Sequence, residues 1–218
     1  MDAVIILSGG MDSAVLLTSQ LPKGTKLSAI SFDYGAKHNH REIPMAAALC
    51  RQAKVTHTVV ALPFVNELFV SDLLISGDDV PDGAYDAENM KQTVVPFRNG
   101  IMLAIAAGYA ESLGASRLLI GSHSGDHAIY PDCRPPFTAA MGAAIAAGTG
   151  NQVALEVPFA ALDKRDIGDL GRRLGVDFRQ TWTCYKGGQI HCGTCGACDE
   201  RKYALRWEEG LDPTEYEK

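Results

Sequence analysis

Residues 4–13 of the chain read VIILSGGMDS, and the apolar run AVLL follows at 14–17 without a break. The first four residues are β-branched or aliphatic and predict a short buried strand, whereas the run after Ser13 predicts the first turns of a helix. The strand therefore leads into the helix through a tight turn at Gly9 and Gly10. Glycine adopts positive φ and lets a ligand approach the main chain, so the N–H groups of this turn can converge on an anion. We interpret the turn as a phosphate-binding loop.

The loop lacks the Gly-Lys-Ser/Thr ending of the P-loop of motor and switch NTPases, so a Lys for the β- and γ-phosphates is missing from its usual place. This difference favours a bound pyrophosphate that leaves. The stretch from Ser8 to Ser13 resembles the SGGxDS loop of the PP-loop ATP pyrophosphatases, which split ATP at the α-phosphate and adenylate a substrate oxygen. The alternative is an ordinary βα turn with a Ser or Asp N-cap.

Strand-like and helix-like segments alternate along the rest of the chain. Further strands are predicted at 26–32, 57–62, 117–121 and 153–158, and helices at 40–53, 98–113, 137–147, 163–174 and 199–208. This order predicts an α/β fold with an open parallel five-stranded sheet and helices on both faces, as the PP-loop resemblance also implies (adenine nucleotide α-hydrolase-like). Residues 64–74 are interpreted as helical, and the acidic, Gly- and Pro-punctuated stretch 76–89 as a mobile functional loop. Asp163 is the expected N-cap of the helix that follows it.

A cluster of four cysteines lies near the C-terminus. It consists of Cys184, Cys192, Cys195 and Cys198, with glycines between the last three. Gaps of two residues let successive thiolates converge on one ion, so the spacing predicts a zinc knuckle in which all four positions are filled and the ion is structural. An iron–sulfur cluster and four buried free thiols are the alternatives, and the adjacent His191 is a substitute ligand.

Length and composition limit the architecture and the partners. With 218 residues, 46% of them hydrophobic, we expect one main core, divided into a nucleotide-binding catalytic domain (1–180) and a zinc-binding segment (181–218) packed on it. The net charge of −6 disfavours a large nucleic-acid footprint and favours small-molecule substrates. Because Met1 and Asp2 lead straight into the first strand, and no apolar run reaches the roughly 18 residues of a membrane span, we expect a cytoplasmic protein.

Five short motifs follow one another in an order that carries a family resemblance. They are SGGMDS at 8–13, FDYGAKH at 32–38, VPFRN at 95–99, YPDCR at 130–134 and TCY at 183–185 with the cysteine triplet. On these residues the chain resembles the 7-cyano-7-deazaguanine synthase family, ATP-dependent ligases that make the nitrile precursor of queuosine and archaeosine. It departs from the family pattern at residues 126–129 and at Phe97, both near the expected substrate pocket.

The resemblance implies a reaction, its cofactors and its partners. The carboxylate of 7-carboxy-7-deazaguanine attacks the ATP α-phosphate, ammonia then displaces AMP to give the amide, and a second ATP activates the amide oxygen so that loss of AMP leaves the nitrile. The implied cofactors are ATP, Mg²⁺ and Zn²⁺, and the implied assembly is a homodimer. Other hypotheses stay open. One is another PP-loop enzyme, which amidates or thiolates tRNA or an amino acid, or which stops at the amide or transfers the activated deazaguanine to another acceptor such as a protein. The other is a nucleotide-binding zinc module that attaches the activated deazaguanine to a protein partner or only senses it.

The predicted nucleotide site combines the loop with the end of the second strand: Leu7, Ser8, Gly9, Gly10, Met11, Asp12, Ser13, Phe32 and Tyr34. We expect Asp12 to contact Mg²⁺ or its waters, with N-capping as the alternative. Arg98 is expected to clamp a phosphate or the substrate carboxylate bidentately, with a surface salt bridge as the alternative. The predicted catalytic residues are Asp12, Ser13, Arg98 and Arg134.

The predicted substrate site combines the start of the helix at 98–113 with the loop after the fourth strand. Its residues are Arg98, Asn99, Asp126, Tyr130, Asp132 and Arg134. Asp126 or Asp132 could accept the paired N–H donors of a guanine-like base while an aromatic ring stacks on it. For Tyr130 the alternative is simple turn chemistry. Cys133 is interpreted as a buried thiol rather than a nucleophile. Lys164 and Lys186 could reach phosphates, but the default interpretation of both is a solvated charge.

Overall fold

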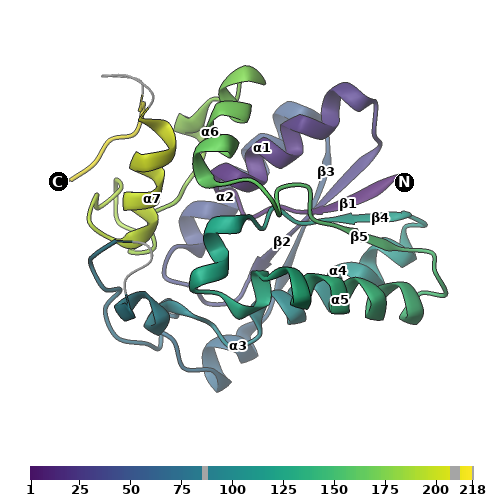
Figure 1. Ribbon diagram of the computed structural model, residues 1–218, viewed down its shortest axis with the longest axis horizontal. Helices are drawn as coiled ribbons and strands as arrows, with labels where there is room; N and C mark the ends of the chain where they lie inside the picture. Colours follow the sequence, from purple (N-terminus) through teal and green to yellow (C-terminus); the bar gives the residue numbers. More distant parts are fainter. Residues whose placement is uncertain (85–87, 207–211, 218) are drawn as a thin grey trace.

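Five parallel strands form the centre of the molecule (Figure 1). A computed structural model of the chain describes residues 1–84, 88–206 and 212–217. The strands are β1 (Ala3–Ile6), β2 (Leu27–Asp33), β3 (Thr56–Ala61), β4 (Arg117–Leu119) and β5 (Ala154–Glu156). Their order is β3-β2-β1-β4-β5, which confirms the predicted open parallel sheet. The order reverses between β1 and β4, and the carboxyl ends of strands beside such a reversal form a ligand-binding crevice.

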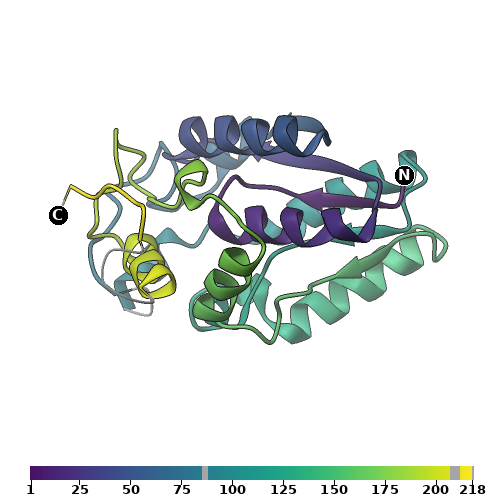
Figure 2. The same ribbon diagram turned by 90° about the horizontal axis from the view of Figure 1, so that it is seen from above.

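The helices lie on both faces of the sheet, as predicted (Figure 2). The structure contains α1 (Met11–Gln20), α2 (Asn39–Ala53), α3 (Pro63–Leu68), α4 (Arg98–Ser112), α5 (Pro135–Gly148), α6 (Lys164–Arg173) and α7 (Gly196–Leu205). Short 3₁₀ turns are η1 (Leu21–Lys23), η2 (Glu88–Thr93), η3 (Ser124–Ala128), η4 (Pro131–Cys133) and η5 (Phe178–Gln180). No helix in the described ranges is both long and apolar enough to cross a bilayer.

The core is divided between the two faces because side chains alternate along β1. Ile5 points to the face covered by α1, α2 and α6 and packs in one cluster with Val15 and Ile167. Val4 points to the opposite face and packs with Leu103 of α4. All of these side chains are buried, so burial of apolar surface on both faces holds the phosphate-binding loop between rigid layers.

The predicted helix at 64–74 is wrong in length. Its helical part, α3, ends at Leu68, and Phe69 already has the extended conformation. The next residues fold around Lys37 instead, whose Nζ donates hydrogen bonds to the carbonyl oxygens of Asp72 and Gly77, among others. These carbonyl oxygens accept hydrogen bonds from the Lys37 ammonium and not from the N–H groups of a helix, so the backbone here is not helical. Residues 85–87 of the predicted mobile loop lie outside the described residues.

The C-terminal segment packs on α6 and shares a core with it. Ala204 and Leu205 of α7 belong to the same apolar cluster as Ile167. Helix α6 begins at the predicted N-cap, because the Asp163 carboxylate accepts the N–H of Asp166 at 2.8 Å. Helix α7 begins at residue 196 rather than 199, and the predicted end of this helix falls partly on residues 207–208, outside the described ranges.

Candidate active site

A cavity of about 210 Å³ lies where the carboxyl ends of β1, β2 and β4 meet the C-terminal segment. Both views show α7 at the end of the molecule opposite the N-terminus, which is the end toward which the parallel strands run (Figures 1 and 2). The predicted site residues that line the cavity are Leu7, Ser8, Gly10, Asp12, Ser13, Phe32, Tyr34, Arg98, Asn99, Asp126 and Tyr130. Gly9, Met11, Asp132 and Arg134 do not line it.

The backbone of the phosphate-binding loop requires glycine at position 9. Gly9 has a φ of +98°, and a Cβ there would lie 2.2 Å from the carbonyl oxygen of Glu42. Helix α2 therefore passes directly against the loop, and no side chain fits between them. Gly10 is the N-cap of α1 and has no side chain to cap it, so the first N–H groups of α1 remain available to an anion. Asp12 is in the first turn and is not the N-cap, which excludes the alternative of plain N-capping.

Two serine hydroxyls hold the loop in shape. The Gly10 N–H donates to Ser8 Oγ at 3.1 Å, and the Gly9 N–H donates to Ser13 Oγ at 3.2 Å. The two hydroxyls lie 3.1 Å apart, so they form one hydrogen-bonded pair. The hydrogen bonds from the glycine N–H groups therefore fix the two serine side chains. The serine hydroxyls and the first turn of α1 form the polar surface of the loop.

Lys164 corrects the expectation of a solvated charge. Its side chain is only 8% exposed, and Nζ lies 2.7 Å from Asp12 Oδ2 and 2.9 Å from Glu200 Oε2. Burial alone would lower the pKa of Lys164, but the two carboxylates outweigh it and raise that pKa. Burial would likewise raise the pKa of Asp12, whereas Lys164 and His123 bring it below the usual value. The cation is therefore permanent and is held between α1, α6 and α7.

His123 completes this cluster and is fully buried. Its Nδ1 accepts the N–H of Gly125 at 3.1 Å, so Nε2 is the nitrogen that faces Lys164, 3.3 Å away, and the Asp126 carboxylate, 3.5 Å away. Neither His123 nor Glu200 follows from a sequence motif. Glu200 is recognisable only because it is two residues after a predicted metal ligand, on the helix that the cysteine cluster starts.

Arg98 lies on the other side of the cavity among aromatic rings. Its Nη1 donates to the Tyr34 hydroxyl at 3.1 Å, and the guanidinium lies 5.7 Å from the Tyr34 ring centre and 5.8 Å from that of Tyr130. Within the described ranges no carboxylate is within salt-bridge distance of Arg98, which excludes the surface salt bridge as its role. A half-buried cation with π-faces around it and no carboxylate partner in the described ranges can attract an anion.

Asp132 and its neighbours build the wall of the cavity behind Arg98. The Asp132 carboxylate accepts the Asn99 N–H at 2.8 Å, at the first turn of α4, so it is occupied in the structure. Asn99 Nδ2 donates to Cys133 Sγ at 3.1 Å, and burial, followed by Asp126, raises the pKa of the Cys133 thiol. This agrees with a buried neutral thiol. Asp126, with a side chain 15% exposed, is the acidic residue of this loop that faces the cavity.

Three of the residues singled out in the sequence do not line the cavity. Arg134 is exposed, and its Nε donates to the His127 carbonyl, so its position gives no support to a catalytic role. Lys186 pairs with Asp82 and is outside the cavity. Phe97, a departure from the family pattern, has a left-handed backbone and packs edge-on against Phe137 of α5.

Glu42 of α2 pairs in the cavity wall with His38, the last residue of the FDYGAKH segment, and the two side chains are 13% and 3% exposed. His38 Nε2 lies 3.5 Å from Glu42 Oε2, and their spacing of four residues places both on one face of the chain. Burial, followed by Arg98, lowers the pKa of His38 to about 3, so the imidazole is neutral. Burial raises the pKa of Glu42 to about 8. Sequence reasoning missed this pair.

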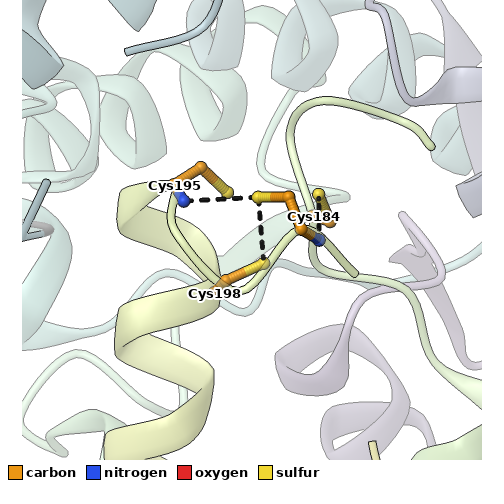
Figure 3. A group of neighbouring side chains, drawn as sticks. Cys184, Cys195 and Cys198 are labelled. Atoms are coloured by element: carbon orange, nitrogen blue, oxygen red, sulfur yellow. Dashed lines mark hydrogen bonds between the residues drawn. The ribbon is translucent and has the colours of Figure 1, made fainter. Parts of the chain in front are cut away.

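The four cysteines gather at the start of α7 (Figure 3). Their sulfur atoms all lie within 4.8 Å of one another, and Cys192 Sγ and Cys198 Sγ are 3.9 Å apart. A tetrahedral site with Zn–S bonds of about 2.3 Å requires sulfur atoms about 3.8 Å apart, so the geometry fits a single ion. Backbone N–H groups of Thr194 and Cys195 donate to Cys192 Sγ, an arrangement that orients a thiolate ligand. The cluster can therefore bind a metal ion.

His191 is not part of the cysteine cluster. Its Nε2 accepts the Thr183 N–H at 3.2 Å, and its ring lies 4.3 Å from that of Trp182. The same segment reaches the phosphate-binding loop, because the Trp182 N–H donates to the Gly9 carbonyl at 3.0 Å. The segment that directly precedes the first cysteine of the cluster therefore forms part of one wall of the cavity, through Trp182 and Thr183.

Comparison with known proteins places this geometry in a family. The model of the queuosine biosynthesis protein QueC family matches residues 2–208. A 7-cyano-7-deazaguanine synthase from Desulfotalea psychrophila is 64% identical over 215 residues, covering 99% of this chain and 98% of the relative. One from Porphyromonas gingivalis is 52% identical over 216 residues, covering 99% and 97%.

A solved structure supports the fold. The NMN synthetase from Francisella tularensis is similar with a TM-score of 0.54 and 16% sequence identity, over 97% of this chain and 80% of that one. At this identity the likeness concerns the fold alone. The family match and the relatives cover the cavity, the phosphate-binding loop and the cysteine cluster together. The chain belongs to the QueC family of queuosine biosynthesis proteins.

Proposed function

We propose that the chain is an ATP-dependent ligase that converts 7-carboxy-7-deazaguanine and ammonia to 7-cyano-7-deazaguanine, with release of AMP and pyrophosphate. Family membership supports the reaction class. The observation that carries the proposal is the shared cavity: a phosphate-binding loop lies on one wall, and on another lies Arg98, a half-buried cation with no carboxylate partner in the described ranges. Such a cavity can hold a triphosphate and a carboxylate side by side.

The loop and the first turn of α1 would bind the departing pyrophosphate. Ser8 and Ser13 supply hydroxyls, and the N–H groups that open α1 supply donors where negative charge develops. A Mg²⁺ ion fits at Asp12, because Oδ1 of this carboxylate is buried with no hydrogen-bond partner in the described part of the chain. The ion would neutralise charge on the leaving phosphates when bound. Phe32 and Tyr34 line the neighbouring wall for the nucleoside.

The deazaguanine would bind between Arg98 and the 122–136 loop. The guanidinium of Arg98 offers a planar fork to the substrate carboxylate, so it orients the attacking oxygen toward the α-phosphate. Asp126 faces the cavity and can accept adjacent N–H donors of the base. Tyr130 and Asn99 line the same pocket, whereas the carboxylate of Asp132 acts through its hold on α4.

We propose zinc as the ion of the cysteine cluster, with a structural role, because protein sulfur fills all four positions. The cluster starts α7 and so positions Glu200 and the 181–185 segment in the cavity wall. We also propose that the enzyme works on free small molecules as a cytoplasmic homodimer. Light scattering on the purified protein measures the assembly.

The test of the reaction is pyrophosphate release from ATP that requires both 7-carboxy-7-deazaguanine and ammonia, with mass spectrometry of the product. We expect the nitrile and two AMP per turnover. The amide as final product would favour the alternative of an enzyme that stops there, and an adduct on protein or tRNA would favour a transfer enzyme. No stimulation by the carboxylate would exclude the proposed ligase.

The test of the metal is Cys195→Ser. Removing one thiolate opens the coordination shell, and because site formation and folding are coupled, zinc content and melting temperature should fall together. Metal analysis and thermal unfolding measure the two quantities on the same sample. Cys50→Ser, a change of a buried thiol outside the cluster, is the matched control and should leave the zinc content unchanged. Lost zinc with unaltered melting would contradict a structural role.

A further inference from the structure

The proposed reaction requires a base that the binding residues do not supply. When ammonia attacks the acyl adenylate, the new C–N bond forms as the C–O bond to AMP breaks, and the nitrogen must lose one proton. When the amide oxygen attacks the second ATP, the nitrogen loses another, and a third leaves as the C–O bond to AMP breaks and the triple bond forms. Each of these protons needs an acceptor beside the substrate nitrogen.

Most carboxylates in the cavity already serve other groups. Asp12 and Glu200 both bind the ammonium of Lys164, so protonating either would remove one of the two carboxylates that neutralise this buried cation. The carboxylate of Asp126 accepts the backbone N–H of His123. Glu42 differs from these because, within the described ranges, its ion pairs include no Lys or Arg.

The position of Glu42 is suited to the reacting centre. A Cβ at Gly10 would lie 3.6 Å from Glu42 Oε1, so this oxygen is beside the phosphate-binding loop. The other oxygen, Oε2, faces His38 Nε2 at 3.5 Å. The carboxyl group therefore lies in the wall that joins the loop to Arg98, where an acyl adenylate would span the cavity.

The surroundings of Glu42 keep it able to accept and release protons. The charged and titratable groups that face it are His38 on its own segment, Asp12 on α1, Arg98 on α4 and Tyr34 after β2. Burial is the main reason that its pKa rises to about 8; Arg98 lowers this value and Asp12 raises it. A base whose pKa lies near the working pH is effective both in taking up a proton and in giving it back to solvent.

We propose that Glu42 is the general base that accepts protons from the substrate nitrogen in amide and nitrile formation, and that His38 is a positioning residue that orients its carboxyl group. This inference rests on the proposed function and adds to it a role for two residues. Adenylation itself needs no base, because the substrate carboxylate is already ionised. A variant that lacks the base should therefore keep adenylation of the carboxylate and lose formation of the amide and the nitrile.

The decisive variant is Glu42→Gln, which keeps the shape and removes the base. We expect carboxylate-dependent exchange of labelled pyrophosphate into ATP, measured without ammonia, to stay within about 3-fold of the unaltered enzyme, while amide and nitrile formation fall by about 10²-fold or more. Added formate should restore part of the ammonia-dependent rate to Glu42→Ala. Glu111→Gln, an exposed change on α4, is the matched control and should leave both rates unchanged.

The role of His38 has its own pair of variants. His38→Gln keeps an N–H that can reach the carboxyl group, and His38→Met keeps only bulk, so the first should retain more of the kcat for amide formation with equal pyrophosphate exchange. Equal losses in both would overturn the positioning role. Normal amide formation in Glu42→Gln, or a parallel loss of exchange, would overturn the base. Absence of exchange in the unaltered enzyme would instead overturn the proposed function, and this inference with it.

Discussion

Lys164 and Arg98 are two cations that line one cavity, the first buried and the second half-buried, and they differ in what neutralises them. Lys164 contacts two carboxylates from two helices, Asp12 and Glu200, at hydrogen-bond distance. Arg98 has aromatic rings and a tyrosine hydroxyl around it, and no carboxylate within salt-bridge distance in the described ranges. The fold neutralises the first cation itself and leaves the second without a carboxylate partner in the described ranges.

This difference separates stability from binding. Removing one partner of a charge that the fold balances internally lowers the free energy of unfolding, because the remaining charges are stranded in a low dielectric. Charge that the fold leaves without a partner costs free energy in the folded protein, and an anion that binds there supplies the missing charge-assisted hydrogen bonds. A variant at Lys164 should therefore change mainly the free energy of unfolding, and a variant at Arg98 should change mainly the binding of the substrate.

The largest effect is expected for Lys164→Met. The variant leaves the carboxylates of Asp12 and Glu200, 24% and 9% exposed, beside each other without their ammonium partner. We expect a loss of about 3–5 kcal/mol in the free energy of unfolding, measured by urea denaturation. Adding Glu200→Gln should recover part of this loss because one stranded charge is removed. A single variant as stable as the unaltered protein would remove the distinction between the two cations.

Arg98→Lys should affect binding rather than folding. A lysine keeps the charge but loses the planar fork, so the KM for the carboxylate substrate should rise about 10-fold to 100-fold, equivalent to about 1.5–3 kcal/mol for hydrogen bonds to a charged group. The melting temperature should change little, because no ion pair to a carboxylate is broken. Steady-state kinetics and thermal unfolding on the same preparation measure both. A large drop in melting temperature with normal KM would reverse the assignment.

Glu42→Gln tests a third ionisable group of the cavity through the pH dependence of the free energy of unfolding. The pKa of Glu42 is about 8 in the folded protein against 4.5 for an ordinary glutamate, so between these values the folded state holds a proton that the unfolded state has released. Its contribution to stability is complete below pH 4.5 and is lost as pH rises through about 8. The variant lacks this loss, so it should gain stability relative to the unaltered protein from pH 5 to pH 8. Urea denaturation across that range would show parallel curves if the pKa of Glu42 were unshifted.

The smallest effect is expected for Arg134→Gln. This side chain is exposed and outside the cavity, and its Nε bonds a single backbone carbonyl. Pyrophosphate exchange should therefore stay within about 2-fold, and the free energy of unfolding within about 0.5 kcal/mol, as for ordinary surface positions. A large loss of exchange would restore the catalytic role that the YPDCR motif suggests for Arg134 and would add a third cation to the comparison.

The sequence predicted those parts of the site that depend on short spacing. The SGGMDS loop and the cysteine cluster each lie within a few turns of chain, so glycine, capping and thiolate patterns are enough to identify them. Lys164 was mistaken for a solvated charge because its environment consists of residues from α1 and α7. The helix expected at 64–74 failed for a similar reason, since the ammonium of Lys37 organises that backbone from another element.

By itself the sequence determined the alternation of strands and helices, the place of the SGGMDS loop and the four cysteines that could hold a metal ion, because each depends on residues close together in the chain. Only the tertiary structure decided which charges meet. Asp12 and Lys164 are 152 positions apart, and Glu42 reaches the loop because α2 packs against Gly9. The sheet brings the carboxyl ends of distant strands to one edge, and burial there sets which cation is neutralised, which stays open for a ligand and which carboxyl group can take a proton.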